Sequence, residues 1–469
     1  MNVLLINPPL ENIIKNVPPS IAKVRDEGYP NLGILYLAAH LKKNSDTDVK
    51  ILDTQIERLS YNRLKKKVEK ITPDIVGINV TSFTLMDAIL TARIVKSIDE
   101  NIKIVFGGRH PSIYPEETIS SHVDFVVVGE GEITFTELVK SIGNNKAVKN
   151  VKGLVFRKGD RIIFTGSRKP LRNLDDLPFP ARELTPYKRY KHVMTKNKIF
   201  TTMMSSRGCP YNCLFCDRSQ GNIFRARNPS NVVDEIEECL SMGIKNIFMH
   251  DDTFTLDRKR AIRICDEILK RKLDAHLIIR TRANLVDKEL LRKLRLAGCE
   301  KVHYGIESGN EKILKILKKG ITREQVEKAV KITKENDMEV LGDFMIGSPG
   351  EKEKEILETI DFAIKLGLDY AFFSITTPYP ATQLYKLGLE KGLYHDYWKE
   401  FSKNPIIDFQ PKLWTEYLPE ERLYDLYKYA YKSFYKRPSY IFKQLLKVTS
   451  LQELSEKIKI GLQLFSDVN

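Results

Sequence analysis

The stretch that decides the fold is Arg207-Gly-Cys-Pro-Tyr-Asn-Cys-Leu-Phe-Cys216, which places Cys209, Cys213 and Cys216 in a C-x3-C-x2-C array after the β-rich run Thr201 to Ser206. Three thiols fit structural zinc poorly, because it takes four ligands, and an odd number does not make a disulfide framework. Soft thiolates at this spacing suit a cubic iron-sulfur cluster and leave one iron without a protein ligand. The alternative is three incidental buried cysteines.

The array, with Phe215 before its third cysteine and a Gly-Cys-Pro opening, resembles the radical S-adenosylmethionine (SAM) superfamily. The resemblance implies that the three cysteines hold a 4Fe-4S cluster whose open iron chelates SAM. It further implies that an electron from the cluster cleaves SAM to a 5'-deoxyadenosyl radical, which removes a hydrogen atom from an unactivated carbon. Such an enzyme requires an electron donor such as ferredoxin or flavodoxin.

Residues 1–145 alternate strand and helix patterns, which predicts an α/β domain with a doubly wound parallel sheet. Ligands of such sheets bind at the carboxyl ends of the strands. The residues expected there are Asn7, Pro8, Thr81, Ser82, Gly107, Gly108, Arg109, His110, Gly129, Glu130 and Gly131.

Asn-Pro-Pro after the first strand, Gly-Gly-Arg-His-Pro111 and Gly-Glu-Gly-Glu132 resemble the Rossmann-like cobalamin-binding domain that precedes the barrel in one branch of the superfamily. The resemblance implies cobalamin as a third cofactor, and a nucleotide-binding or purely structural sheet is the alternative. This part lacks the Asp-x-His-x-x-Gly motif that ligates cobalt in cobalamin mutases. We therefore expect no histidine on cobalt, with His110 acting as a hydrogen-bonding residue.

Residues 146–195 contain a hairpin-like segment and a Leu-Pro-Phe-Pro run, and we interpret them as a linker. Between 196 and 390, six strand and helix patterns predict a partial (β/α)6 TIM-like barrel with its site at the strand carboxyl ends. The cofactor-binding residues expected there are Phe215, Asp252, Arg282, Glu307 and Ser308, and the individual roles of Asp251, Asp252, Arg280 and Arg282 stay open.

Residues 391–469 predict a helical C-terminal region whose tyrosines have the spacing of a packing stripe. Basic residues among these aromatics allow peripheral contact with a lipid or other anionic substrate. The net charge of +15 comes from lysines spread along the chain, so no nucleic acid partner is expected. Without a spanning segment or a signal peptide, the sequence predicts a cytoplasmic protein.

The resemblance implies a cobalamin-dependent radical SAM methyltransferase that acts on an unactivated carbon of a lipid or small molecule. Relatives with the same parts carry out ring closure or carbon-carbon coupling on lipids or tetrapyrroles, which is the alternative. A tRNA methylthiotransferase is disfavoured because no cysteine precedes Cys209. A non-catalytic cobalamin-binding protein is disfavoured because all three cysteines are present.

Overall fold

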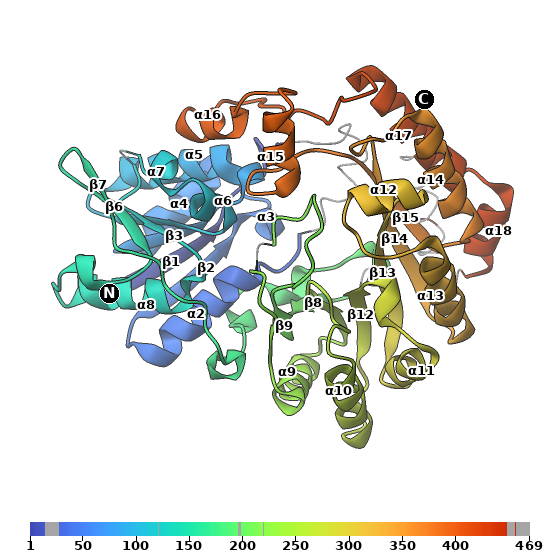
Figure 1. Ribbon diagram of the computed structural model, residues 1–469. Helices are drawn as coiled ribbons and strands as arrows, with labels where there is room; N and C mark the ends of the chain where they lie inside the picture. The colour runs from blue at the N-terminus through green and yellow to red at the C-terminus, as the bar shows by residue number, and fades with distance from the viewer. Residues whose placement is uncertain (15–27, 121, 196–197, 219, 448–454, 456–469) are drawn as a thin grey trace. The chain divides into compact units, whose positions relative to one another are not determined.

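The computed structural model describes residues 1–469 apart from 15–27, 121, 196–197, 219, 448–454 and 456–469 (Figure 1). The chain forms two compact units. Unit 1 contains Met1–Ile14, Gly28–Tyr190 and Asp396–Gln410. Unit 2 contains the described residues of Lys191–His395 and those from Pro411 onward.

Unit 1 is built on a seven-stranded sheet with the order β2-β1-β3-β4-β5-β6-β7. The first five strands in this order are parallel, while β6 is antiparallel to β5 and β7 is antiparallel to β6. The predicted α/β fold is therefore confirmed, but the sheet is mixed, because the hairpin in the expected linker adds two strands to its edge. The strands are β1 Asn2–Asn7, β2 Asp48–Asp53, β3 Ile75–Asn79, β4 Lys103–Gly107, β5 Phe125–Val127, β6 Leu154–Lys158 and β7 Arg161–Phe164.

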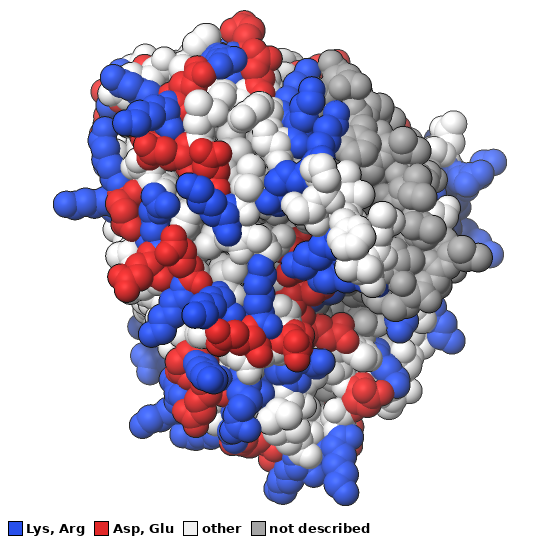
Figure 2. All heavy atoms as spheres, turned by 90° about the vertical axis from the view of Figure 1, so that its right-hand side faces the viewer, with Lys and Arg blue, Asp and Glu red and all other residues white. Residues whose placement is uncertain are grey.

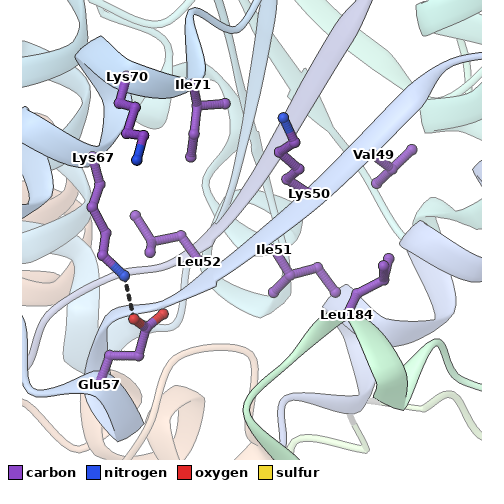
Figure 3. Close-up of a pocket in the computed structure, with 9 residues that line it drawn as sticks. All are labelled: Val49, Lys50, Ile51, Leu52, Glu57, Lys67, Lys70, Ile71 and Leu184. Carbon is purple, nitrogen blue, oxygen red and sulfur yellow. Dashed lines mark hydrogen bonds and ion pairs between the residues drawn. The ribbon is translucent and has the colours of Figure 1, made fainter.

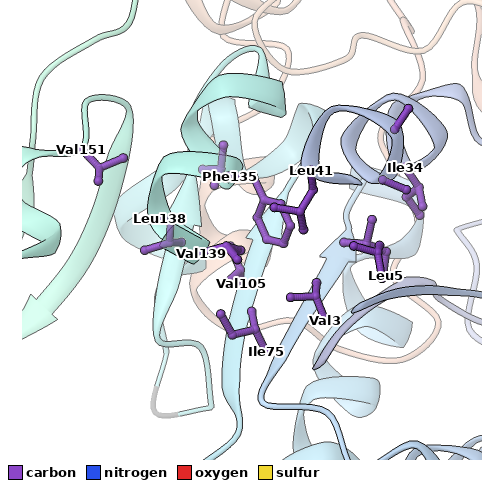
Figure 4. Close-up of a cluster of buried hydrophobic side chains, with 14 of the residues drawn as sticks. Val3, Leu5, Ile34, Leu41, Ile75, Val105, Phe135, Leu138, Val139 and Val151 are labelled. Atoms are coloured by element: carbon purple, nitrogen blue, oxygen red, sulfur yellow. The ribbon is translucent and has the colours of Figure 1, made fainter. Parts of the chain in front are cut away.

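Two helices cover the hydrophobic face of this sheet that Figure 4 shows. Val3 and Leu5 alternate with residues of the opposite face along β1, as a strand requires, and they pack with Phe135 of the second helix. Gly77 on β3 leaves room for that ring, because a Cβ there would lie 2.7 Å from Leu5 Cδ2 and 3.3 Å from Phe135 Cζ. The two helices are α2 Leu32–Asn44 and α8 Gly131–Gly143.

The other helices of unit 1 include one from the C-terminal part of the chain, α16, which packs against α7. Tyr397, Trp398 and Phe401 of α16 are buried, and the Phe401 and Phe409 rings stack with centroids 3.9 Å apart. The remaining helices are α3 Thr54–Glu57, α4 Tyr61–Ile71, α5 Leu85–Ile98, α6 Arg109–Ile113, α7 Pro115–Thr118 and α16 Tyr397–Lys403.

Unit 2 contains a six-stranded parallel sheet with the order β15-β14-β13-β12-β11-β8. Figure 1 shows its helices α9, α10, α11, α13 and α14 along the outside of the curved sheet. The expected barrel-like unit is confirmed. The strands are β8 Phe200–Met203, β11 Asn246–Met249, β12 His276–Thr281, β13 Cys299–Glu307, β14 Glu339–Ile346 and β15 Tyr370–Ile375, and a short antiparallel pair is formed by β9 Ser206–Arg207 and β10 Arg225–Ala226.

The helices of unit 2 follow the strands in the order that a β/α repeat requires. They are α9 Pro229–Ser241, α10 Arg258–Lys270, α11 Lys288–Leu296, α12 Glu311–Ile316, α13 Arg323–Glu335, α14 Glu353–Lys365, α15 Gln383–Glu390, α17 Glu420–Tyr435 and α18 Pro438–Leu446. No helix of the described ranges combines the length and the apolar character needed to cross a bilayer.

Two tyrosines of α17 bond to the backbone of the edge strand β15. The Tyr431 hydroxyl accepts from Phe373 N and donates to Phe373 O, both at 3.2 Å. The Tyr435 hydroxyl accepts from Ala371 N at 3.1 Å and donates to Ala371 O at 2.9 Å. The hydroxyls therefore take the place of a neighbouring strand, so the tyrosine stripe has a hydrogen-bonding role in addition to packing.

Charged side chains of both signs are interspersed on the face shown in Figure 2. Exposed ion pairs such as Arg258–Asp287 and Arg271–Asp234, with closest N–O distances of 2.6 Å, join neighbouring helices. The net charge of +15 is thus carried by a surface that also contains many carboxylates.

Candidate functional site

The three cysteines lie in a loop between β9 and β10 that is fixed by backbone contacts. Gly208 has a φ of 86°, and a Cβ there would lie only 2.2 Å from Ile223 O, so only glycine fits. Cys209 N donates to Gly221 O at 3.1 Å, and Cys216 N donates to Cys213 O at 3.2 Å. All three thiols are free, with Cys213 buried and the other two half-buried.

Arg282, just beyond β12, braces this loop from the barrel side. Its guanidinium lies 3.7 Å from the centroid of the Tyr211 ring, and Nη1 donates to Cys213 Sγ at 3.5 Å. Nη2 donates to the backbone oxygen of Lys319. Most of the guanidinium is therefore engaged in holding the loop, and its Nε is buried without a partner in the described structure.

Glu307, at the end of β13, is linked to Phe215 of the cysteine loop by Lys319, which contacts both side chains. Lys319 Nζ is 2.8 Å from Glu307 Oε1 and 5.6 Å from the centroid of the Phe215 ring. Glu307 has a φ of 71° at an irregularity in the pairing of β13 with β14. Gly305 leaves space for this pair, because a Cβ there would lie 2.7 Å from Glu307 Oε1.

Ser308 follows Glu307 but its side chain is fully buried and bonded within the fold. Its hydroxyl is 3.0 Å from Thr359 Oγ1 and accepts from Asn310 N at 3.1 Å. These contacts fix the turn that leads into α12. Of these two predicted residues, Glu307 therefore lies near the cysteine loop, whereas Ser308 stabilises the turn that follows β13.

The two aspartates after β11 have different environments. Asp251 is fully buried and accepts from Ser205 N at 2.7 Å, Ser205 Oγ at 2.6 Å and Ser206 Oγ at 2.5 Å, so it ties β11 to the start of the cysteine loop. Asp252 has one buried carboxylate oxygen, Oδ2, without a hydrogen-bond partner in the described structure. Burial and the neighbouring Asp251 and Asp217 charges raise the pKa of Asp252. A cationic group placed there would satisfy that oxygen.

In unit 1 the strand order reverses between β1 and β3, which is where sheets of this type bind ligands. Asn7 at the end of β1 is already used by the fold: its Nδ2 donates to Asp53 Oδ1 at 3.0 Å, and its Oδ1 accepts from Asn31 Nδ2 at 3.1 Å. Tyr190 donates to the other oxygen of Asp53 at 2.7 Å. Pro8 O accepts from Gln55 Nε2 at 2.9 Å, so the loop after β1 is held from both sides.

His110, at the start of α6, is fully buried and lies beside the loop after β3. Its Nδ1 is 3.0 Å from Ser82 Oγ, whereas its Nε2 has no partner in the described structure. Burial lowers the pKa of His110 to about 3, so the ring is neutral at physiological pH. Thr81 N donates to Thr84 Oγ1 at 3.1 Å and thereby shapes the same loop.

The loops after β4 and β5 contain glycines at positive φ. Gly108 has a φ of 109°, and a Cβ there would lie 2.7 Å from Val80 O. Gly129 has a φ of 83° with open space around its Cα, so a large ligand can approach the backbone there. Glu130 Oε2 accepts from Leu171 N at 3.0 Å. The other predicted residues of these loops, Gly107, Arg109 and Gly131, lie at the end of β4, in α6 and at the start of α8.

A surface pocket of about 330 Å³ lies beside the edge strand β2 (Figure 3). Lys67 in this pocket is already paired with Glu57. The pocket runs along β2 from Val49 to Leu52, and none of the residues of the predicted site lines it. Its lining residues are Val49, Lys50, Ile51, Leu52, Glu57, Lys67, Lys70, Ile71 and Leu184.

Comparison with known proteins decides the family. The radical SAM superfamily matches residues 203–363, and the B12 binding domain matches residues 20–139. An uncharacterized methyltransferase of Pyrococcus horikoshii is 36% identical over 451 residues, which are 95% of this chain and 95% of that protein. The chain belongs to the radical SAM superfamily, and it carries a B12 binding domain.

This radical SAM protein is also similar to a cyclase in sequence and to a solved cobalamin-dependent enzyme in structure. An anaerobic magnesium-protoporphyrin IX monomethyl ester cyclase of Rubrivivax gelatinosus is 30% identical over 389 residues, covering 81% of this chain and 70% of that protein. The solved structure of the cobalamin-dependent SAM radical enzyme OxsB with aqua-cobalamin has a TM-score of 0.74 at 19% identity and covers 99% of this chain and 72% of that chain. The latter likeness shows the shared fold.

The radical SAM protein uses a 4Fe-4S cluster, SAM and cobalamin, and its cysteine loop fits the cluster. In the part of the chain that the structure describes, no three His, Cys, Asp or Glu side chains converge to hold a single metal ion. A cubic cluster binds each thiolate through a different iron, so it accepts sulfurs that are farther apart than those around one zinc ion.

The charged groups around the cysteine loop and the loops of unit 1 fit the other two cofactors. The unpartnered oxygen of Asp252 suits the amino group of SAM. The open space at Gly129 and the unpartnered Nε2 of His110 suit a large ligand with hydrogen-bonding groups, such as cobalamin.

Several residues of these networks were not predicted from the sequence. Tyr211 and Lys319 contact the cysteine-loop site, while Asp53 and Tyr190 fix the end of β1. Lys319-Gly320 after α12 has no motif of its own, and Tyr190 lies 137 residues from Asp53, so no local signal marks either one.

Proposed function

We propose that this radical SAM enzyme is a C-methyltransferase that transfers a methyl group to an unactivated carbon of a lipid or small molecule. The observation that carries the proposal is that one chain contains both a braced three-cysteine loop and a B12 binding domain. The 36% identity to an uncharacterized methyltransferase over 95% of both chains supports it. When bound, the cluster and SAM supply a carbon-centred radical, and cobalamin supplies a methyl group.

The residues of unit 2 have separate tasks in this proposal. Cys209, Cys213 and Cys216 hold the cluster, and Arg282 keeps the loop in place from the barrel side. Asp252 accepts a hydrogen bond from the amino group of SAM, because its buried Oδ2 has no other partner in the described structure. Glu307 accepts from a SAM hydroxyl with the carboxylate oxygen that does not face Lys319.

The residues of unit 1 bind cobalamin through the loops after β1, β3, β4 and β5. Gly129 allows a ligand to approach the backbone closely, Gly108 lets the loop after β4 pack against Val80, and His110 offers a neutral ring as a hydrogen-bonding group. Because His110 is fully buried beside Ser82, we expect the cobalt to be without a histidine ligand. Electron paramagnetic resonance of the cob(II)alamin form would then lack nitrogen superhyperfine splitting. A clear axial nitrogen signal would contradict this assignment.

A reductant is required, as in all radical SAM enzymes, and a ferredoxin or flavodoxin is the proposed donor. The second candidate function is ring closure, because a magnesium-protoporphyrin cyclase is 30% identical over 81% of the chain. Both functions would begin with the same hydrogen abstraction and differ in what happens to the substrate radical.

The test is deletion of the gene followed by untargeted lipid and metabolite profiling during feeding with trideuteromethyl methionine. Methylation predicts loss of a metabolite that carries one intact trideuteromethyl group on an unactivated carbon. Cys213→Ala should fail to restore it, whereas Cys265→Ala, a buried free cysteine of α10, should restore it. A lost ring product without that label would replace the methyltransferase with the cyclase.

A further inference from the structure

The inner face of the unit 2 sheet presents a group of charged and aromatic side chains that have no assigned role. Strand register places Arg280 opposite His303, and Gly305 opposite Asp343, which is itself opposite Phe372. Directly opposed residues of parallel strands point to the same side of the sheet. All of these side chains therefore share one face with Glu307 and Lys319, whose pair occupies the space above Gly305.

Each of the two carboxylates on this face lies beside a basic side chain. Lys319 pairs with Glu307 at 2.8 Å, and His303 Nε2 lies 2.8 Å from Asp343 Oδ2, although off the line of a good hydrogen bond. Burial would raise the pKa of Asp343, but attraction to His303, Arg280 and Lys319 outweighs it and lowers that pKa. Asp343 therefore stays ionised.

Arg280 contributes a guanidinium to this face, and its charge acts on the carboxylates of Asp343 and Asp252. The guanidinium lies 5.5 Å from the centroid of the Phe248 ring, and its Nε is buried without an acceptor in the described structure. A guanidinium stacked on an aromatic ring keeps its edge free for hydrogen bonds in the ring plane. A buried donor without an acceptor is unfavourable, so an oxyanion bridging Nε and one Nη would satisfy it.

The side chains near Arg280 on this face are accessible. His250 is exposed, and Phe372, whose ring centroid is 5.8 Å from that of His303, is half-buried. Burial, together with the charge of Arg280, nevertheless lowers the pKa of His250 to about 4. The His250 ring lies next to Phe248, with ring centroids 5.7 Å apart, and Phe248 in turn lies under the Arg280 guanidinium. A neutral imidazole there can donate a hydrogen bond to an anion beside Arg280.

We propose that Arg280, assisted by His250, binds a carboxylate or phosphate group of the organic substrate on the inner face of the unit 2 sheet. This inference rests on the proposed function, since it places an anionic group in that enzyme's substrate. Phe248 and Phe372 offer apolar contact to the atoms that carry the anion. SAM is the other source of a carboxylate, so the test separates the two.

The experiment uses holoenzyme with its cluster and cobalamin, and inorganic phosphate as the probe. Phosphate binding is followed by phosphorus NMR line broadening, with and without saturating SAM, and SAM affinity is measured separately by equilibrium dialysis. We expect phosphate to bind in the presence of SAM and its affinity to fall at least tenfold in Arg280→Met. Arg263→Met, an exposed arginine of α10, serves as the control and should leave it unchanged.

Arg280→Lys keeps the charge but loses the bidentate geometry, so its phosphate affinity should fall several-fold even if the methionine variant does not fold. Wild-type protein that fails to bind phosphate, or Arg280 variants that bind it normally, would overturn the proposal. A tenfold loss of SAM affinity in Arg280→Lys would assign the arginine to SAM instead. The readout needs no turnover, so the methyltransferase function can fail in the labelling experiment without affecting this result.

Discussion

Lys319 Nζ lies 2.8 Å from Glu307 Oε1, and their side chains are only 7% and 10% exposed. The pair lies next to Phe215 of the cysteine loop, and Glu307 adopts a φ of 71° to reach it. Because the two charges are held in a buried place, each depends on the other for compensation. Glu307 was predicted from the sequence as a site residue, and its charge is compensated by Lys319, which no sequence motif indicates.

Replacing Lys319 with methionine should lower the free energy of unfolding by about 3–5 kcal/mol, because it leaves the Glu307 carboxylate buried and unpaired. Urea denaturation followed by circular dichroism measures this. Glu307→Gln combined with Lys319→Met should recover part of the loss, and Lys312→Met, an exposed lysine of α12, should have little effect. Equal stabilities of Lys319→Met and wild type would show that the pair is not buried in solution.

Gly208→Ala should prevent the cysteine loop from retaining its cluster, because the new Cβ would meet Ile223 O at 2.2 Å. Gly221 gives a matched control in the same loop: its φ of 93° strains any other residue, but a Cβ there meets nothing within 4 Å. Gly221→Ala should therefore cost about 1–3 kcal/mol from strain alone and keep its iron. Iron content per chain after anaerobic reconstitution decides the matter, and equal iron in both variants would refute this role of Gly208.

Glu351 should make the protein less stable as the pH rises from about 5 to 8. Burial raises the pKa of Glu351 from 4.5 to about 8, opposed by hydrogen bonds from Ser348 and Gly347. Between these two values the folded state holds a proton that the unfolded state has lost, so folding weakens as the pH rises through this window.

Glu351→Gln keeps an acceptor for Ser348 N and removes the titration. It should therefore be more stable than wild type at pH 8, by on the order of 3 kcal/mol, and similar to it at pH 5. Thermal unfolding across this pH range measures the difference, with the exposed Glu327→Gln as the control. A parallel pH dependence of wild type and Glu351→Gln would exclude Glu351 as its cause.

Tyr431→Phe and Tyr435→Phe should each lower the free energy of unfolding by about 1–2 kcal/mol, because each removes the partner of a backbone N–H and C=O on the edge of β15. Tyr429→Phe, on the exposed side of the same helix, is the control and should be neutral. Native-state hydrogen exchange offers a sharper measurement. Ala371 and Phe373 amides should exchange faster in the double variant, and unchanged protection would rule out these hydrogen bonds.

The sequence predicted the elements that local patterns encode. The alternating runs gave all six strands of the unit 2 sheet, and the cysteine spacing located the loop after β9. The pattern also identified the hairpin formed by β6 and β7, but assigned it to a linker. Pairing of β6 with β5 depends on which edge of the finished sheet is open, and no local periodicity carries that information.

The roles of individual polar residues were harder to predict for the same reason. Arg280 and Arg282 both lie at the end of one strand, yet Arg282 braces the cysteine loop while Arg280 keeps a buried donor without an acceptor in the described structure. Asn7 has both ends of its amide occupied by Asp53 and Asn31. Whether a side chain already has a partner is a property of the folded chain, and distant residues decide it.

The membership of α16 in unit 1 has a consequence for any attempt to divide this protein. The chain leaves unit 1 after Tyr190, supplies the strands of unit 2, returns for Asp396–Gln410 and then leaves again. Neither unit is a continuous gene segment, so a fragment ending at Tyr190 would lack the aromatic residues of α16 and uncover the surface of α7 that they bury. No single junction in the chain therefore separates the two units, so an exchange of one unit between related proteins has to carry Asp396–Gln410 together with the N-terminal part.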